Sequence, residues 1–378
     1  MKSFRFNIAP LAGNGSRIAA IDELKGLAII LVLVYHCGGV LGALNVIHGE
    51  IGVDIFLILS GVALAMNSSG MPLGHFLLRR FLRIYPSYWL ALGFYIWMHH
   101  HFLGVVRPWE TIWQHILGIH AFSRLTYFAD FADAFWFISM IVAAYLVFAC
   151  IRRRLDDLSL IIGVTGVLTV IATLAYQHFG NIGGLISLAV RIPSFFIGVI
   201  AGRLLGSGTA ELRLNLLLGL GLVSFYYLTF FRETTCAYSI PALGIILLWL
   251  GLRQQVSKLR VGRMFLGAFA LLGLISYEVY LFHQPLVRDY NFYFYHVILK
   301  VPAPNRMQLL EGIFAALGLT VAIAVPVHFL TDRALSFRRR RADKAEAMAA
   351  IVRAGQPESD NRDLDTALDY PLGDRVAR

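Results

Sequence analysis

Long apolar runs, separated by short polar or charged segments, make up most of this chain. About ten of them approach or reach the roughly 20 residues that an α-helix needs to cross a bilayer. They lie near residues 24–46, 51–68, 84–104, 133–151, 158–177, 185–205, 214–231, 237–252, 264–287 and 310–331. The pattern therefore predicts an all-α polytopic membrane protein, a bundle of about ten transmembrane helices.

Composition supports a membrane protein, and the distribution of charge predicts its orientation. Hydrophobic residues make up 58% of the chain, and the mean hydropathy is +0.67. The net charge is +10, and basic residues recur in clusters after every second span. These clusters are Arg79, Arg80 and Arg83; Arg152 to Arg154; Arg203 and Arg213; Arg253, Lys258, Arg260 and Arg263; and Arg338 to Arg341. This positive-inside pattern predicts both termini in the cytoplasm, and it makes the lipid bilayer, not a nucleic acid, the partner of the positive charge.

The domain organisation follows from where the apolar runs end. We expect a transmembrane domain over residues 1–341 and a mostly disordered cytoplasmic tail over 342–378, because the tail is polar and mixed in sign. The three cysteines show no metal-ligand spacing, and no metal is predicted. The run His99–His101 lies at a predicted span end, where we expect an interfacial, solvated role. The chemistry is therefore expected inside the membrane bundle.

Two ionisable residues stand inside the first apolar run, Lys25 near its start and His36 near its middle. They are eleven residues apart, about three helical turns and a rise of roughly 16 Å, so both fall on one helix face. An ionisable residue at membrane depth is costly and by default indicates function. A cation at the membrane surface and a proton acceptor at the midplane suit the two ends of a long ligand. Ile29 and Val32 share this face and are expected to line the ligand's path.

Six short motifs occur in a fixed order between residues 17 and 330. They are Asp22–Ala28 with Tyr35–His36, Gly52–Phe56 with Ser60–Gly61, Arg80–Pro86, Phe135–Ser139, Arg191–Gly198 and Ser276–Pro285. Each motif is weak alone, but in this order they resemble the membrane-bound acyltransferase 3 family. Lys25 and His36 match that family's basic residue and histidine, and Arg80 with Arg83 matches its RxxR motif.

The chain departs from the family pattern at several positions. Many members carry glutamate five residues after the motif tryptophan, where this chain has Ile141, so no carboxylate role carries over. Leu57 and Val62 replace aromatic residues, which concerns packing more than chemistry. Many relatives also carry a fused periplasmic hydrolase-like domain, which residues 342–378 do not provide. We therefore expect a stand-alone form, similar to enzymes that acetylate exopolysaccharide or lipid-linked sugars.

The resemblance implies an acyltransferase of the bacterial cytoplasmic membrane. It would move an acetyl or other short acyl group from cytoplasmic acyl-CoA, with acetyl-CoA as the expected donor, to a hydroxyl of an exopolysaccharide or a lipid-linked sugar unit. Arg80 and Arg83 lie in a predicted cytoplasmic loop and share a face if it is helical; their paired donors suit the phosphates of the donor. Lys25 lies on the same side, and the roughly 16 Å to His36 is about the reach of a pantetheine arm.

His36 is the expected general base, because histidine titrates near neutral pH and a sugar hydroxyl must lose its proton to attack. Asp54 is expected to orient the imidazole. If the first two spans are antiparallel and turn near residues 45–48, His36 and Asp54 would lie at similar depth. Glu50 is the alternative, closer to the outer surface.

The acceptor side holds three further candidates. Arg191, at the outer edge of its span, is expected either to snorkel toward headgroups or to stabilise a developing oxyanion. Trp136 is a candidate for stacking on a sugar ring, and His283 is either a second polar residue of the acceptor site or a packing residue of its motif. Two other classes of function stay open from the sequence: a transporter or flippase of a polar lipid or glycan, and a structural partner in polysaccharide synthesis.

Overall fold

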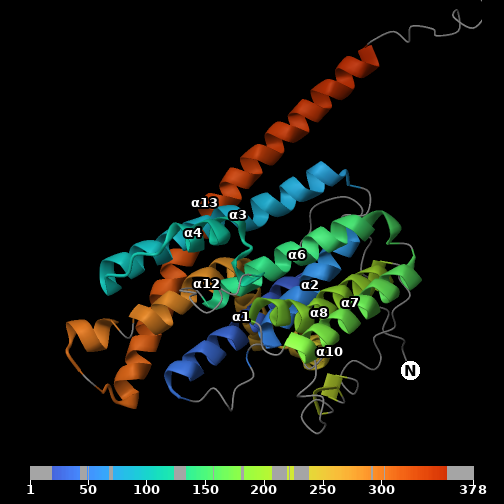
Figure 1. Cartoon of the computed structure of the whole chain (residues 1–378). Coiled ribbons are helices and arrows are strands. Elements are labelled where there is room, and N and C mark those ends of the chain that lie inside the picture. Colours follow the sequence, from blue (N-terminus) through green and yellow to red (C-terminus); the bar gives the residue numbers. More distant parts are fainter. Residues whose placement is uncertain are drawn as a thin grey trace, which may run out of the picture. The chain divides into compact units, whose positions relative to one another are not determined.

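The computed structural model of the chain is dominated by α-helices in the residues that it describes, namely 19–42, 49, 51–67, 71–122, 133–155, 157–179, 183–206, 219–220, 222–224, 238–290, 293–301 and 303–355. No β-strand occurs within these ranges. The all-α class predicted from the apolar runs is therefore confirmed for this part of the chain (Figure 1).

Helices occupy every predicted span except the one near 214–231, most of which lies outside the described residues. They are α1 (Ala19–Val40), α2 (Ile51–Asn67), α3 (Leu73–Leu103), α6 (Trp136–Ile151), α7 (Leu158–Phe179), α8 (Gly183–Gly206), α10 (Ser239–Val256), α11 (Arg260–Leu274), α12 (Ser276–Gln284) and α13 (Arg306–Gly355). Shorter helical segments are α4 (Trp109–Leu117), η2 (His120–Phe122), η3 (Asp133–Phe135), η4 (Arg152–Arg154), and the π-helical η6 (Pro285–Tyr290) and η7 (Tyr293–Ile298).

Three helices within the described ranges are long and apolar enough to cross a membrane: Ala19–Val40, Trp136–Arg154 and Arg306–Ala334. A bent pair, Arg260–Leu274 with Ser276–Ile298, meets the same criteria as one span broken by 66°. The span predicted near 264–287 is therefore not one straight helix. Three further apolar helical segments, Ile51–Asn67, Leu158–Ile171 and Ser239–Arg253, are shorter than a full span. The count of about ten spans and the cytoplasmic termini therefore stay predictions.

Glycine allows α1 to approach its neighbours at backbone distance. A Cβ atom built on Gly26 would lie 2.0 Å from the carbonyl oxygen of Phe269 in α11, and one on Gly52 of α2 would lie 2.3 Å from the carbonyl oxygen of Ala28. Small residues are what let helices pack this closely in a bilayer. α1 is therefore held between α2 and α11, which fixes the direction of its polar side chains.

We expect Gly26→Ala to destabilise the bundle by about 1–3 kcal/mol, because the added methyl group must push two backbones apart. Gly93→Ala in α3 is the matched control, since nothing lies within 4 Å of its Cβ position, and alanine favours a helix by about 1 kcal/mol over glycine. Thermal unfolding of both variants in one detergent measures the difference. Equal melting temperatures would contradict the close contact between α1 and α11.

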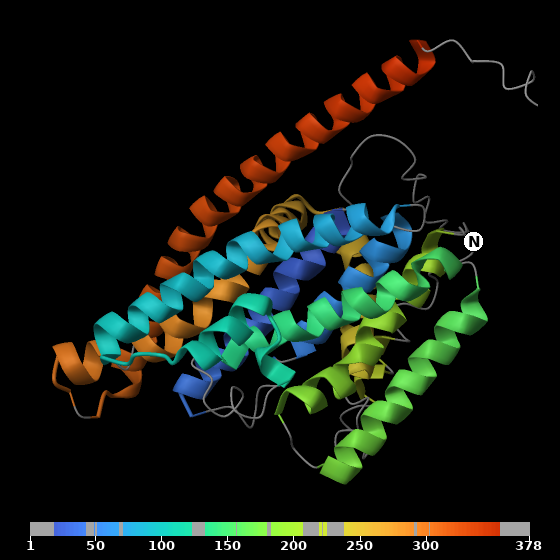
Figure 2. The same ribbon diagram turned by 45° about the horizontal axis from the view of Figure 1, so that its top comes forward.

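α2 and α8 run side by side in the same direction. Asp54, near the start of α2, pairs with Arg191 of α8. One turn later in α2, the carbonyl oxygen of Ile58 would lie 2.0 Å from a Cβ atom built on Gly198, which is also later in α8. The parallel course is what the second and sixth spans of an alternating topology require. Figure 2 shows α1 and α2, in blue, packed among later helices, and the motif residues Asp22, Glu23 and Asp54 of these two helices are buried.

The chain divides into two compact units, Met1–Thr331 and Asp332–Arg378. Within the second unit, helix α13 continues without a break through position 341 to Gly355. The predicted boundary between residues 341 and 342 therefore falls inside a helix, and residues 342–355 at the start of the predicted tail are helical. All site residues discussed below belong to the first unit.

Candidate active site

A pocket of about 160 Å³ lies between α1, α2, α3, α6 and α12, and we call it the cationic pocket. Its lining residues are Lys25, Phe56, Leu59, Ser60, Ala63, Arg80, Arg83, Ile84, Phe137, Ile141, Tyr145, Ser276, Tyr277 and Tyr280. The three cations predicted to bind the anionic end of a ligand thus meet at one cavity. The packing of α1 and α3 brings them together from separate motifs.

The two arginines of the pocket lie in α3, whose first residue is Leu73. The loop predicted around them is therefore helical, and Arg80 and Arg83 share one helix face, as expected for that case. The guanidinium of Arg80 lies over the rings of Phe76 and Tyr145, 5.7 and 5.8 Å from their centroids. Its Nε atom is buried and has no hydrogen-bond partner among the residues that the structure describes. Arg80 therefore keeps a donor available to a ligand.

Acidic side chains flank the cationic pocket at α1. Lys25 Nζ lies 3.2 Å from Asp22 Oδ1, and the Lys25 side chain is 32% exposed. Glu23, which follows Asp22 in the sequence, accepts a hydrogen bond of 2.6 Å from Arg253 of α10. Asp22 and Lys25 therefore form an ion pair at the edge of the pocket. Because Lys25 is partly exposed, it can turn toward a ligand without breaking the core.

A pair of histidines lies beyond the inner wall of the pocket. The ring of His36 lies 4.8 Å from that of His283, centroid to centroid, and the ring of His283 lies 5.7 Å from that of Tyr280. Tyr280 lines the pocket, and its hydroxyl donates to the carbonyl of Ala134. His283 is fully buried, whereas His36 is half-buried. A continuous path of rings therefore leads from the cationic pocket to His36.

Asp54 is fully buried and lies in a polar cluster with α8 and α10. It pairs with Arg191 and accepts a hydrogen bond of 2.6 Å from Ser194, whose hydroxyl lies 2.7 Å from that of Ser239. The guanidinium of Arg191 also packs over two rings, 5.2 Å from Trp136 and 4.4 Å from Tyr238. Arg191 is only 7% exposed, so its side chain is buried in this cluster.

The register between α1 and α2 differs from the one expected. Because Gly52 packs against Ala28 in an antiparallel pair, Asp54 lies almost three turns from His36 along α1, and the expected equal depth is wrong. The turn near residues 45–48 that suggested equal depth lies outside the described residues, as does Glu50. The roles predicted for Asp54 and Arg191 stay predictions, and the contacts that the structure shows join the two residues to each other.

The expected path along one face of α1 is also different. Ile29 and Val32 are almost fully buried and belong to the hydrophobic core, and neither lines the cationic pocket. The wall of the pocket is instead built by one face of α2, including Ser60 and Ala63, together with α3, α6 and α12. Ile141 stands in this wall, so the position where many acyltransferase 3 members carry glutamate faces the pocket with an apolar side chain.

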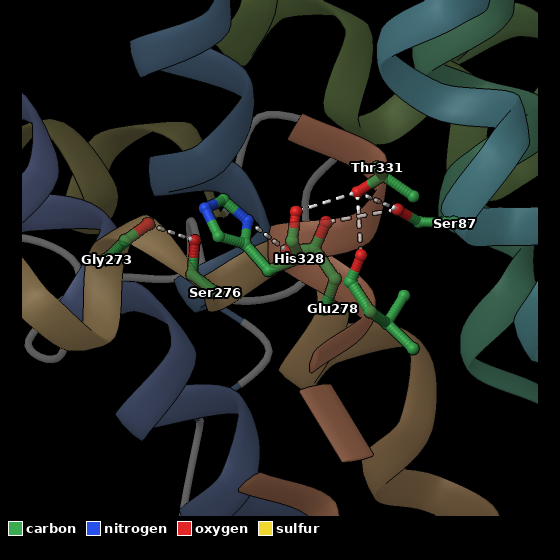
Figure 3. A network of polar contacts seen from close by, with 7 residues as sticks. Ser87, Gly273, Ser276, Glu278, His328 and Thr331 are labelled. Carbon is green, nitrogen blue, oxygen red and sulfur yellow. Dashed lines mark hydrogen bonds and ion pairs between the residues drawn. The ribbon is translucent and has the colours of Figure 1, made fainter. Parts of the chain in front are cut away.

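A second buried polar network lies next to the pocket, around Glu278 of α12, and was not predicted from the sequence. Figure 3 shows Ser87 of α3, and His328 and Thr331 of α13, grouped around Glu278 of α12. Glu278 accepts hydrogen bonds from Ser87, at 3.1 Å, and from Nδ1 of His328, at 3.2 Å. Both ionisable residues interrupt apolar runs, which was a signal for this site. The network ties three helices together next to Tyr277 of the pocket.

The histidine run at the end of α3 is less solvated than expected. His99 is 3% exposed, and its Nδ1 accepts a hydrogen bond of 2.9 Å from Arg107, which leaves Nε2 to donate to Asp289, at 3.1 Å. The solvated role expected for the run is therefore wrong for His99, whose ring is buried in a polar cluster, whereas His100 and His101 are exposed. No group of three or more metal-ligating side chains occurs in the part of the chain that the structure describes.

Comparison with known proteins places the chain in a family. The model of a family described as an acyltransferase domain matches residues 18–328. A protein of Komagataeibacter xylinus named as a membrane-bound transacylase, BcsY, is 26% identical over 307 residues, which cover 72% of this chain and 74% of that protein. No solved structure matches the chain significantly. The family model spans the motifs that carry the cationic pocket and the histidine beyond it, and the chain belongs to the acyltransferase 3 family.

Proposed function

We propose that the protein transfers an acetyl or other short acyl group from cytoplasmic acyl-CoA to a hydroxyl of a bacterial exopolysaccharide or lipid-linked sugar. The observation that carries this proposal is the convergence of Lys25, Arg80 and Arg83 on one pocket whose inner wall leads to His36. The cations suit the phosphates of the donor. The ring path suits the acyl end of its long arm.

The donor arm would enter between α2 and α3 and extend toward Tyr280. Lys25 and His36 are about 16 Å apart along α1, close to the length of an extended pantetheine arm. To reach His36, the thioester must pass Tyr280, whose ring separates the pocket from His283. The phosphates stay at the arginines, which hold the donor while the acyl end reacts.

The chemistry assigned to His36 is general base catalysis. Its imidazole takes the proton of the acceptor hydroxyl while the oxygen attacks the thioester carbonyl carbon. The tetrahedral intermediate then collapses, the carbon–sulfur bond breaks, and the CoA thiolate leaves and takes up the proton. His36 is half-buried, so an acceptor can approach it from the side opposite to His283. The cation of Arg191 lies in the same bundle, next to Trp136, and would stabilise the oxyanion.

Blocking the pocket tests the donor path. Ala63 lines the pocket and is half-buried, so Ala63→Phe fills it without displacing a core residue. We expect the KM for acyl-CoA to rise at least tenfold, because a loss of about 1.4 kcal/mol in the binding free energy of the donor already weakens its affinity tenfold. The melting temperature should change little. Ala63→Ser is the matched control and should behave as wild type. Normal acyl-CoA kinetics in the phenylalanine variant would show that the donor binds elsewhere.

The function itself is tested with purified protein in nanodiscs and labelled acetyl-CoA. We expect release of free CoA and incorporation of label only when an extract of lipid-linked or polymeric glycan is added. The acetyl content of the cell-surface glycan, compared with and without the gene, gives the same answer in the cell. If glycan crosses the membrane while no acyl group is transferred, the protein is a transporter and the proposal fails.

A further inference from the structure

His283 has a fixed proton and a free lone pair in the centre of the bundle. Its Nδ1 atom lies 2.7 Å from the carbonyl oxygen of Tyr280, and a carbonyl only accepts, so Nδ1 carries the proton. In the neutral ring Nε2 is then an acceptor. This Nε2 atom is buried and has no hydrogen-bond partner within the described part of the chain. Buried polar atoms are rarely left unpaired, so a partner is expected in the working state.

The ring of His36 lies beside that of His283. The two rings are 4.8 Å apart and tilted by 59°. Two imidazoles that share an N–H···N hydrogen bond have ring centres roughly 5 Å apart. The separation therefore suits such a bond, which requires that a nitrogen of His36 turn toward Nε2 of His283. Catalytic hydrogen bonds are often poorly aligned before substrate binds and tighten in the reacting complex.

We propose that His283 is the positioning residue of the general base: its Nε2 accepts the N–H of His36 and so fixes the tautomer that turns the other nitrogen toward the acceptor hydroxyl. This rests on the proposed function of His36. The carboxylate expected to orient His36, that of Asp54, is instead bonded to Arg191 and Ser194. His283 thus acts through His36 and does not contact the sugar.

The proton balance of the step is simple. His36 gains the hydroxyl proton on the nitrogen that faces the acceptor and keeps its N–H to His283. The imidazolium charge is then shared along the hydrogen bond, and the same proton returns to the CoA thiolate. Two adjacent cationic imidazoles are disfavoured, so the pair carries one extra proton and not two. Tyr280 lines the pocket, and its carbonyl oxygen accepts the hydrogen bond from Nδ1 of His283.

Three substitutions separate the acceptor atom from the shape of the ring. In His283→Gln the side-chain carbonyl oxygen replaces Nε2 and still accepts. His283→Asn can keep the contact to Tyr280 but has no acceptor near His36, and His283→Phe keeps the ring shape but neither nitrogen. We expect kcat to fall about 10- to 100-fold in the asparagine and phenylalanine variants with KM for acyl-CoA unchanged, and glutamine to recover most of the loss. Equal kcat values in all three variants would overturn the proposal.

A measurement on the resting protein decides the point without turnover. Solid-state spectra of ¹⁵N-histidine-labelled protein in lipid, assigned by the difference from a His36→Gln sample, report which nitrogen of His36 is protonated. We expect one tautomer in wild type and in His283→Gln, and a mixture of two in His283→Phe. An unchanged His36 signal in His283→Phe would overturn the proposal. If wild type transfers no acyl group, the proposed function fails, while these spectra still decide whether His283 orients His36.

Discussion

His36→Ala is expected to reduce acyl transfer by roughly 10²- to 10⁴-fold, the usual cost of removing a general base. Binding of acyl-CoA should change little, because the cations and the rings that line the cationic pocket do not include His36. The combination distinguishes a chemical role from a binding role: kcat falls while KM and the affinity for CoA stay the same. Single-turnover transfer and calorimetric titration with CoA, both in nanodiscs, measure the two quantities.

The control for this variant is His100→Ala. His100 is also a histidine of the first unit but is exposed on α3, away from the pocket, and its loss should leave transfer unchanged. Because His36 is half-buried, free imidazole added to the alanine variant should restore part of the activity. Full activity of His36→Ala, or equal losses in His36→Ala and His100→Ala, would remove His36 from the mechanism.

The donor side of the site could be predicted from the sequence because its residues are charged and its spacing is short. Arginines three positions apart share a helix face wherever that helix lies, and a lysine at the start of an apolar run stays near the membrane surface. These local rules predict Lys25, Arg80 and Arg83 on one side of the bundle, and in the structure all three line one pocket. The pocket that joins them depends on how α3 packs on α1, and no local pattern contains that information.

The partner of His36 illustrates what the sequence left open. The expected depth of Asp54 was counted from a turn near residues 45–48, but the register is set by backbone contact between Gly52 and Ala28. Helix contacts of this kind depend on which small residues face each other across a pair, which periodicity alone does not show. His283 was a candidate from its motif, and the structure supplies the ring contact on which the positioning role proposed for it rests.

The bent span shows the same limit for the fold. Residues 264–287 form one apolar run, but the helix breaks at Ile275 and continues as α12 and the π-helical η6. Breaks in membrane helices are tolerated where neighbouring helices satisfy the backbone, and they frequently mark functional sites. Here the break brings Ser276, Tyr277 and Tyr280 to the cationic pocket and His283 to His36. Hydropathy predicted the run but not the bend that builds the site.

The double variant Arg80→Ala/Arg83→Ala is expected to weaken CoA binding by at least about 100-fold. Each guanidinium would lose charge-assisted hydrogen bonds to phosphate worth about 1.5–3 kcal/mol, or roughly 10- to 150-fold in affinity. Arg80 keeps a buried Nε donor unused by the described chain, which suits it for such a ligand. Arg83→Lys should recover only part of the loss, since an ammonium group cannot make the two parallel bonds of a guanidinium.

Arg79→Ala is the matched control, because Arg79 lies on the same helix, is exposed and is absent from the lining of the pocket. It removes the same charge from the same region, so it measures what long-range attraction alone contributes. We expect less than a threefold change for it, and this change should vanish in high salt, whereas the pocket arginines keep most of their effect there. Calorimetry with CoA in nanodiscs at two salt concentrations makes the comparison. If the double variant binds CoA as tightly as Arg79→Ala does, Arg80 and Arg83 only anchor α3 at the membrane surface, and the donor must bind at another face of the bundle.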